Sequence, residues 1–211
     1  MRAASRILRH GAAKPVAFLL CLLPLILLGL RYPDDLGFNP VETINRYTGD
    51  WALRFLLITL VVTPAARLTG WNDIMRFRRM IGLFAFAYAF LHLSSYVALD
   101  QLFDWARIWA DIVKRNFITV GMLTILLLLP LAITSTKGMM RRLGGKRWQA
   151  LHRLVYPAAA LAVLHYYMMV KADVTEPLIY AGILAILLGY RALRSLRQRP
   201  RKRPAETAAN L

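Results

Sequence analysis

The chain has 211 residues, of which 58% are hydrophobic, and its mean hydropathy is +0.45. Soluble domains contain about 45–50% apolar residues, so this composition excludes an ordinary soluble fold. The formal net charge is +17, from 28 Lys and Arg against 11 Asp and Glu. A soluble chain with that charge would be a candidate nucleic-acid binder. The single cysteine, Cys21, excludes an internal disulfide and a thiolate metal cluster.

Six apolar segments are expected to form helices that span a membrane. Each has about 16–20 residues and would reach about 24–30 Å as a helix, which is close to the hydrocarbon thickness. Their apolar runs are continuous rather than alternating, which favours helices over barrel strands. The segments are Pro15–Leu30, Trp51–Leu68, Met80–Leu99, Phe117–Ile133, Leu151–Val170 and Leu178–Leu193. The expected fold class is therefore an all-α six-transmembrane-helix bundle.

The positions of the basic residues predict the orientation of this bundle. The N-terminal arm, the second and fourth connections and the C-terminal tail hold 20 of the 28 Lys and Arg residues, whereas the three alternate loops hold six. Short loops rich in Lys and Arg remain in the cytoplasm, so both termini are expected there, and the protein in the bacterial inner membrane.

The positive charge then forms a cytoplasmic surface that faces anionic lipid. No nucleic-acid binding is expected, because no folded recognition module accompanies the basic tail. The expected domains are a basic arm over residues 1–14, the bundle over 15–193, and a basic, disordered tail over 194–211.

Three of the four histidines lie in apolar segments: His92 in the third, His152 and His165 in the fifth. Ionisable groups inside a bilayer are costly, so each is a candidate functional residue. The alternative for a lone histidine is a packing contact with a neighbouring helix. His92 lies about 18 Å and His165 about 21 Å from the cytoplasmic start of its segment. The two imidazoles are therefore expected at one level, in the outer half of the membrane.

Two histidines at one level favour haem over a bare metal ion. Haem iron needs only axial protein ligands, because the porphyrin supplies four nitrogens. Zinc needs three or four protein ligands, and no carboxylate or thiol is expected at this depth. His92 and His165 are therefore the predicted axial ligands.

The cytoplasmic level of the same two segments has a different composition. His152 lies about 20 Å toward the cytoplasm from His165, and the matching residue of the third segment is Arg78. Pro157 could kink the fifth segment and re-aim one ring. A guanidinium is a poor iron ligand, but it is a good partner for a haem propionate or for a flavin or quinone head group. We therefore expect a less well-defined inner redox site around His152 and Arg78.

No Gly-x-Gly-x-x-Gly fingerprint for a dinucleotide occurs in the chain. Electrons are therefore expected from quinol in the membrane or from a separate cytoplasmic flavin reductase. The leading hypothesis is an electron-transfer subunit. A stand-alone transmembrane ferric or quinone reductase is an alternative, as is a transporter or scaffold with structural histidines.

The stretches Thr134–Gly138, Leu143–Gly144 and Trp148–Tyr156, together with His92 and His165, carry a family resemblance. They resemble the MsrQ (YedZ) branch of the ferric-reductase-like transmembrane family. The resemblance implies haem b, and FMN at an unknown site. It also implies electron transfer to a periplasmic molybdenum enzyme, MsrP, which reduces methionine sulfoxide in oxidised envelope proteins.

By the same resemblance, the chain is a redox subunit and does not itself reduce methionine sulfoxide. The wider family tends to carry two histidines on each of two helices, and Arg78 stands where the fourth would fall. The candidate site residues are His92 and His165 as axial ligands, His152 as haem-associated, and Arg78, Trp148 and Arg153 as cofactor-binding.

Overall fold

The computed structural model describes residues 8–31 and 36–197, and all the regular secondary structure within these ranges is helical. Residues 194–197 of the expected tail belong to the last helix, and the remainder of that tail lies outside the described residues. Short 3₁₀ and π turns follow α3 and α4, at Asn72–Arg76 and Tyr96–Asp100. The helices are α2 (Ala13–Leu30), α3 (Pro40–Thr69), α4 (Arg78–Ser95), α5 (Trp105–Lys114), α6 (Asn116–Ile133), α7 (Lys137–Leu143), α8 (Gly145–His152), α9 (Val155–Met169) and α10 (Thr175–Arg197).

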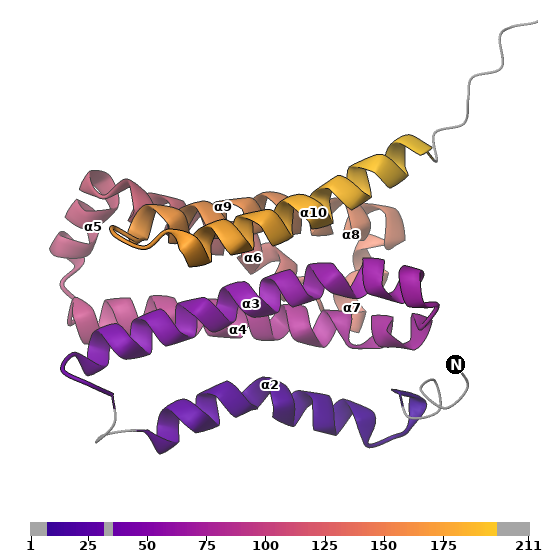
Figure 1. Ribbon diagram of the computed structural model, residues 1–211, viewed down its shortest axis with the longest axis horizontal. Coiled ribbons are helices and arrows are strands. Elements are labelled where there is room, and N and C mark those ends of the chain that lie inside the picture. The colour runs from indigo at the N-terminus through magenta and orange to yellow at the C-terminus, as the bar shows by residue number, and fades with distance from the viewer. Residues whose placement is uncertain (1–7, 32–35, 198–211) are drawn as a thin grey trace, which may run out of the picture.

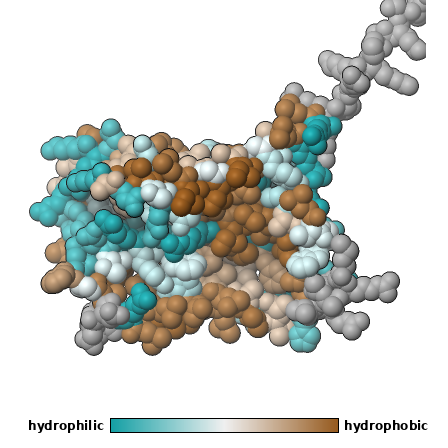
Figure 2. All heavy atoms as spheres, in the orientation of Figure 1, coloured by the Kyte–Doolittle hydropathy of each residue, from teal (hydrophilic) through white to brown (hydrophobic). Residues whose placement is uncertain are grey.

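The long helices run side by side along the long axis of the molecule (Figure 1). Helix α5 lies at one end of the bundle, and α7 and α8 lie at the other; we call these the α5 end and the α8 end. Helix α2 begins and α10 ends at the α8 end. The apolar side chains of α2 form a continuous brown band along the lower edge of Figure 2. Hydrophilic atoms gather at the α5 end in the same view.

Within the part of the chain that the structure describes, five helices are long and apolar enough to cross a membrane: α2, α3, α4 with its π turn, α6 and α10. The all-α fold and the membrane-spanning character are therefore as expected. The fifth expected segment, Leu151–Val170, differs from its prediction. It is divided between α8, which ends at His152, and α9, which has 15 residues. Pro157 lies in the first turn of α9, where its missing N–H leaves no hydrogen bond unmade, so it does not kink one continuous helix.

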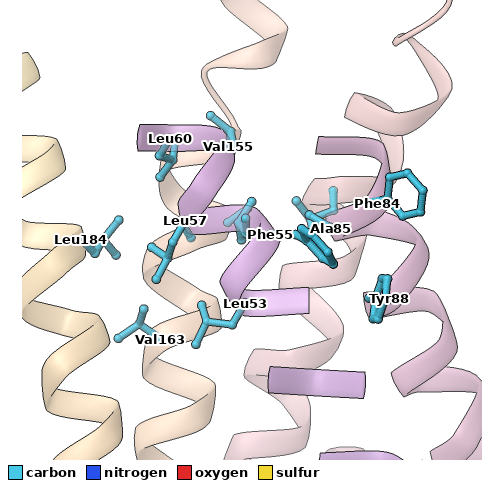
Figure 3. Packing of buried hydrophobic residues seen from close by; sticks show 14 of the residues in the cluster. Leu53, Phe55, Leu57, Leu60, Phe84, Ala85, Tyr88, Val155, Val163 and Leu184 are labelled. Atoms are coloured by element: carbon cyan, nitrogen blue, oxygen red, sulfur yellow. The ribbon is translucent and has the colours of Figure 1, made fainter. Parts of the chain in front are cut away.

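Helix α3 lies at the centre of the packing. Half of the apolar stretch of α3 that could cross a membrane is buried inside the bundle. The corresponding share is 11% to 22% in the other four candidate spans. Figure 3 shows Leu53, Phe55 and Leu57 of α3 between residues of α4 on one side and of α9 and α10 on the other. Helix α3 begins at Pro40, well before the expected Trp51, because the Asn39 side chain accepts a hydrogen bond from the Glu42 amide and caps the helix.

Candidate functional site: two histidine sites at opposite ends of the bundle

A cavity of about 450 Å³ lies at the α5 end, between α3, α4, α6 and α9. Its volume falls within the roughly 300–1,000 Å³ of small-molecule and cofactor sites. Apolar side chains line most of it, and polar side chains from the outermost turns line its mouth. His92 from α4 and His165 from α9 both line this cavity, so the structure brings the two predicted ligands together.

The two imidazole rings lie close together, with one ring edge-on to the other. Their centroids are 6.1 Å apart and their planes meet at 74°. A metal–imidazole bond is about 2 Å long, and the centre of the ring lies about 1 Å from its nitrogens. Two rings that share one metal atom between them therefore have centroids about 6 Å apart. The observed separation leaves room for one metal atom between the rings.

Each ring is held from behind by a backbone carbonyl. His92 Nδ1 lies 2.9 Å from the Asn45 carbonyl oxygen of α3, and His165 Nδ1 lies 2.7 Å from the Phe117 carbonyl oxygen of α6. A carbonyl only accepts, so each Nδ1 carries the proton and donates it. Nε2 of each neutral ring is then an unprotonated electron-pair donor. Metal-binding histidines in proteins are oriented in this way.

The cavity suits a flat group that brings its own equatorial ligands better than a bare ion. Among the described residues, no group of three or more His, Cys, Asp or Glu side chains could hold a metal ion. Small residues from all four helices line the space beside the rings: Gly49, Ala52, Ala85, Ala89, Gly121 and Ala162. Two arginines, Arg46 and Arg115, lie at the polar mouth, paired with Glu42 at 2.8 Å and Asp111 at 3.1 Å.

The second histidine site lies at the α8 end. His152 is the last residue of α8, and its ring stacks on Trp148 with centroids 3.8 Å apart. Nδ1 of His152 lies 3.0 Å from the Trp148 carbonyl oxygen, and the Trp148 indole N–H donates to the Thr134 carbonyl at 2.9 Å. Nε2 of His152 is buried and has no hydrogen-bond partner among the described residues.

The Leu131 carbonyl also lies near the His152 ring, but it receives no hydrogen bond, because a neutral imidazole has one N–H and the Trp148 carbonyl accepts it. One ring nitrogen of His152 therefore stays unsatisfied. Burial lowers the pKa of His152; the Trp148 carbonyl opposes this shift, and the nearby Arg78 charge adds to it. The ring is therefore neutral at pH 7 and keeps an electron pair at its buried nitrogen.

Arg78 and Arg153 have different surroundings. Arg78, the first residue of α4, lies within electrostatic range of His152 and of two other cations, Arg67 and Arg191. Among the described residues it forms no ion pair. Arg153 is exposed in the turn between α8 and α9. The structure therefore groups His152 with Trp148 and Arg78, and it leaves the Arg153 side chain at the surface.

The carbonyl partners and the glycines of the first site were not foreseen from the sequence. Tyr88, one of the tyrosines near His92, donates its hydroxyl proton to the Cys21 carbonyl at 2.9 Å. Ser95 donates to the backbone carbonyl of His92 rather than to its ring. Gly121, which lies within an expected apolar segment, was the available signal, but a glycine alone does not indicate which side chain occupies the space beside it.

The apolar helices and the paired histidines of α4 and α9 define a class of membrane protein, and the sequence comparisons identify it. Residues 48–163 match the family model described as ferric reductase like transmembrane component, and the chain belongs to that family. The match begins in α3 and ends in α9.

Three relatives are similar over most of the chain, and each is named "Protein-methionine-sulfoxide reductase heme-binding subunit MsrQ". The relative from Rhodospirillum rubrum is 62% identical over 90% of this chain and 92% of its own length. That from Xanthomonas euvesicatoria is 51% identical, with 89% of both chains covered. That from Herminiimonas arsenicoxydans is 53% identical over 83% of this chain and 82% of its own.

Proposed function

We propose that this protein is a haem b electron-transfer subunit that delivers electrons to a periplasmic methionine sulfoxide reductase. The observation that carries the proposal is the pair His92 and His165, with ring centroids 6.1 Å apart across one cavity. The name of the relatives, a haem-binding subunit of a methionine sulfoxide reductase, supports the same function.

His92 and His165 are the axial ligands in this proposal. The Asn45 and Phe117 carbonyls fix each Nδ1–H, so both Nε2 atoms are available to bind iron. A bound haem would supply a one-electron carrier, and its apolar surroundings and axial ligands would set the reduction potential. The small side chains beside the rings leave space for the macrocycle, and the apolar lining excludes water from it.

We propose a six-span topology in which α9 is the fifth span. Helix α2 begins and α10 ends at the α8 end (Figure 1), as an even number of crossings requires. The Lys and Arg residues of α7 and α8 favour a cytoplasmic position for that end in an inner-membrane protein. The cavity then opens toward the periplasm, where the acceptor is the molybdenum enzyme MsrP. The proposed bundle covers residues 15–193, between the basic arm and the basic tail.

His152, Trp148 and Arg78 form the proposed entry side of the path. Electrons enter there from quinol or from a cytoplasmic flavin reductase. Arg78, which has no ion-pair partner among the described residues, suits a propionate or a phosphate of FMN. Arg153, exposed in the adjoining turn, is available for the same anion or for lipid phosphate.

A stand-alone ferric or quinone reductase is the second candidate function, because the family model is described by ferric reductases. It would use the same haem and pass electrons directly to a small acceptor at the mouth of the cavity.

A reduced-minus-oxidised spectrum of the purified full chain tests both candidates. We expect the bands of a low-spin b-type haem, and a colourless, folded preparation would contradict both. Stopped-flow mixing of the reduced protein with purified periplasmic molybdoenzyme, or with a ferric chelate, separates them. Rapid reoxidation by the molybdoenzyme supports the electron-transfer subunit, whereas reoxidation by the chelate alone supports the stand-alone reductase.

A further inference from the structure

Each proposed ligand ring lies against a glycine of the helix that also holds its Nδ1. On α3, Gly49 follows the hydrogen-bonded Asn45 by one helical turn. On α6, Gly121 follows the hydrogen-bonded Phe117 by one turn. The histidine follows its carbonyl partner by 47 residues in the first case and by 48 in the second. The same arrangement of carbonyl and glycine therefore occurs once for each ring.

The space beside these glycines is filled by the imidazoles. A Cβ atom on Gly49 would lie 3.0 Å from His92 Nδ1 and 3.1 Å from its Cε1. A Cβ atom on Gly121 would lie 2.9 Å from His165 Cε1 and 3.0 Å from its Nδ1. Non-bonded carbon atoms are normally about 3.5–4.0 Å apart. Any side chain at either position would therefore push the ring aside.

Two other helical glycines show that this contact is specific. A Cβ atom on Gly82 of α4 would lie 3.5 Å from the Thr59 side chain, which is an ordinary contact. A Cβ atom on Gly189 of α10 would meet nothing within 4 Å. Glycine lowers helix stability at every such interior position. Alanine at Gly49 or Gly121 would therefore stabilise the helix itself, and only the neighbouring ring opposes it.

The rings cannot move away freely. Each Nδ1–H is fixed to its carbonyl at 2.7–2.9 Å, so a shift that relieves the clash would lengthen or bend that hydrogen bond. The displaced ring would also carry its Nε2 away from the midpoint between the two histidines.

We propose that Gly49 and Gly121 are positioning residues that set the orientation of the two ligand imidazoles. The proposal rests on haem ligation by His92 and His165. Each carbonyl–glycine pair fixes the plane of its own ring, and the two pairs belong to different helices. The two ring planes meet at 74° as a result. The orientation of the ligand planes controls the electronic splitting of the iron, so the glycines also tune the haem.

Electron paramagnetic resonance (EPR) of the ferric protein measures this orientation. Nearly perpendicular imidazole planes give a low-spin signal dominated by one large g value, whereas nearly parallel planes give three resolved g values. We expect the first form in the wild type and in the controls Gly82→Ala and Gly189→Ala. Gly49→Ala and Gly121→Ala should change the g values or convert part of the haem to a high-spin form. Unchanged spectra in both variants would overturn the proposal.

A thermal unfolding cycle on the haem-free full chain gives an independent readout. Gly49→Ala should lower the unfolding midpoint when His92 is present. In a His92→Ala background the added methyl group enters vacated space, so the same change should leave the midpoint equal or higher. Gly121→Ala should behave likewise with His165→Ala. Equal shifts in both backgrounds would overturn the packing that the proposal requires.

The two readouts also separate this proposal from the proposed function. A wild-type chain that binds no haem would contradict the proposed function. A haem-loaded wild type whose glycine variants keep its EPR spectrum would contradict the positioning role alone.

Discussion

The two histidine sites use the same side chain in opposite ways. At the α5 end, His92 and His165 each donate one ring N–H to a carbonyl, and both residues line a shared cavity. At the α8 end, the ring of His152 is covered by Trp148, and its buried Nε2 has no partner among the described residues. The first site holds two imidazoles that one metal atom could join, whereas the second holds a single imidazole.

The residue opposite the histidine accounts for the difference. His92 has His165 across the cavity, whereas the charged group near His152 is Arg78. A guanidinium repels a metal cation and attracts an anion. The α5 end therefore suits a metal atom, as we propose for the haem iron, and the α8 end suits an anionic group beside a neutral imidazole. The predictions below test this contrast, from the largest expected effect to the smallest.

Replacing either ligand at the α5 end should have the largest effect. His92→Ala and His165→Ala should each abolish the low-spin haem spectrum, because one axial ligand cannot hold a six-coordinate iron. Haem content per chain and the reduced-minus-oxidised spectrum measure the loss. His10→Ala, which changes an exposed histidine of the arm, is the matched control and should match the wild type. Wild-type haem content in both ligand variants would contradict the ligand assignment.

Replacing the histidine at the α8 end should affect electron entry and spare the other site. His152→Ala should leave the His92–His165 spectrum intact and slow reduction by a quinol analogue by about tenfold, the usual scale for a group that tunes a redox site. Stopped-flow reduction of the haem measures this rate, with the exposed neighbour Gln149→Ala as control. Loss of the His92–His165 spectrum would instead make His152 essential to that haem, and the two sites would not be separate.

The sequence predicted the pairing of His92 and His165 because depth along a helix follows from residue number alone. It did not predict their carbonyl partners, since every residue has a carbonyl and only tertiary packing selects one. Asn45 and Gly49 also fell outside the expected second segment, which began at Trp51. Hydropathy ended that segment at polar residues, whereas the capped helix continues back to Pro40.

The α8 end was harder to predict for a different reason. One apolar run across residues 151–170 indicated a single helix, but the chain turns at Arg153 and Leu154, between α8 and α9. His152 and His165 therefore belong to different helices, and the separation of about 20 Å that one straight helix predicts does not apply to them. The stacking of His152 on Trp148, one turn earlier in α8, is a local contact that the four-residue spacing allows.

Arg78→Gln should have opposite effects on stability and on cofactor binding. Removing a partly buried cation that lies near Arg67 and Arg191 relieves repulsion, so the haem-free protein should gain about 1 kcal/mol or less of unfolding free energy, given partial solvent screening. Binding of FMN, followed by fluorescence quenching, should weaken. Arg79→Gln, at an exposed neighbour, is the control for both measurements. A variant that loses stability and binds FMN normally would exclude an anion-binding role for Arg78.

The smallest expected effect separates the two contacts of Trp148. Trp148→Phe keeps an aromatic ring against His152 and removes the indole N–H that donates to the Thr134 carbonyl. A net hydrogen bond is worth about 0.5–1.5 kcal/mol, so the unfolding free energy in detergent should fall by about 1 kcal/mol, with the quinol reduction rate unchanged. Trp148→Ala removes the stack as well and should slow reduction in the manner of His152→Ala. Trp109→Phe, on the exposed face of α5, should change neither quantity. Trp148→Phe could instead slow reduction as strongly as Trp148→Ala. The hydrogen bond from the indole to the Thr134 carbonyl, rather than the stacked ring, would then position His152. The α8 end would in that case depend on a backbone carbonyl, as the α5 end does.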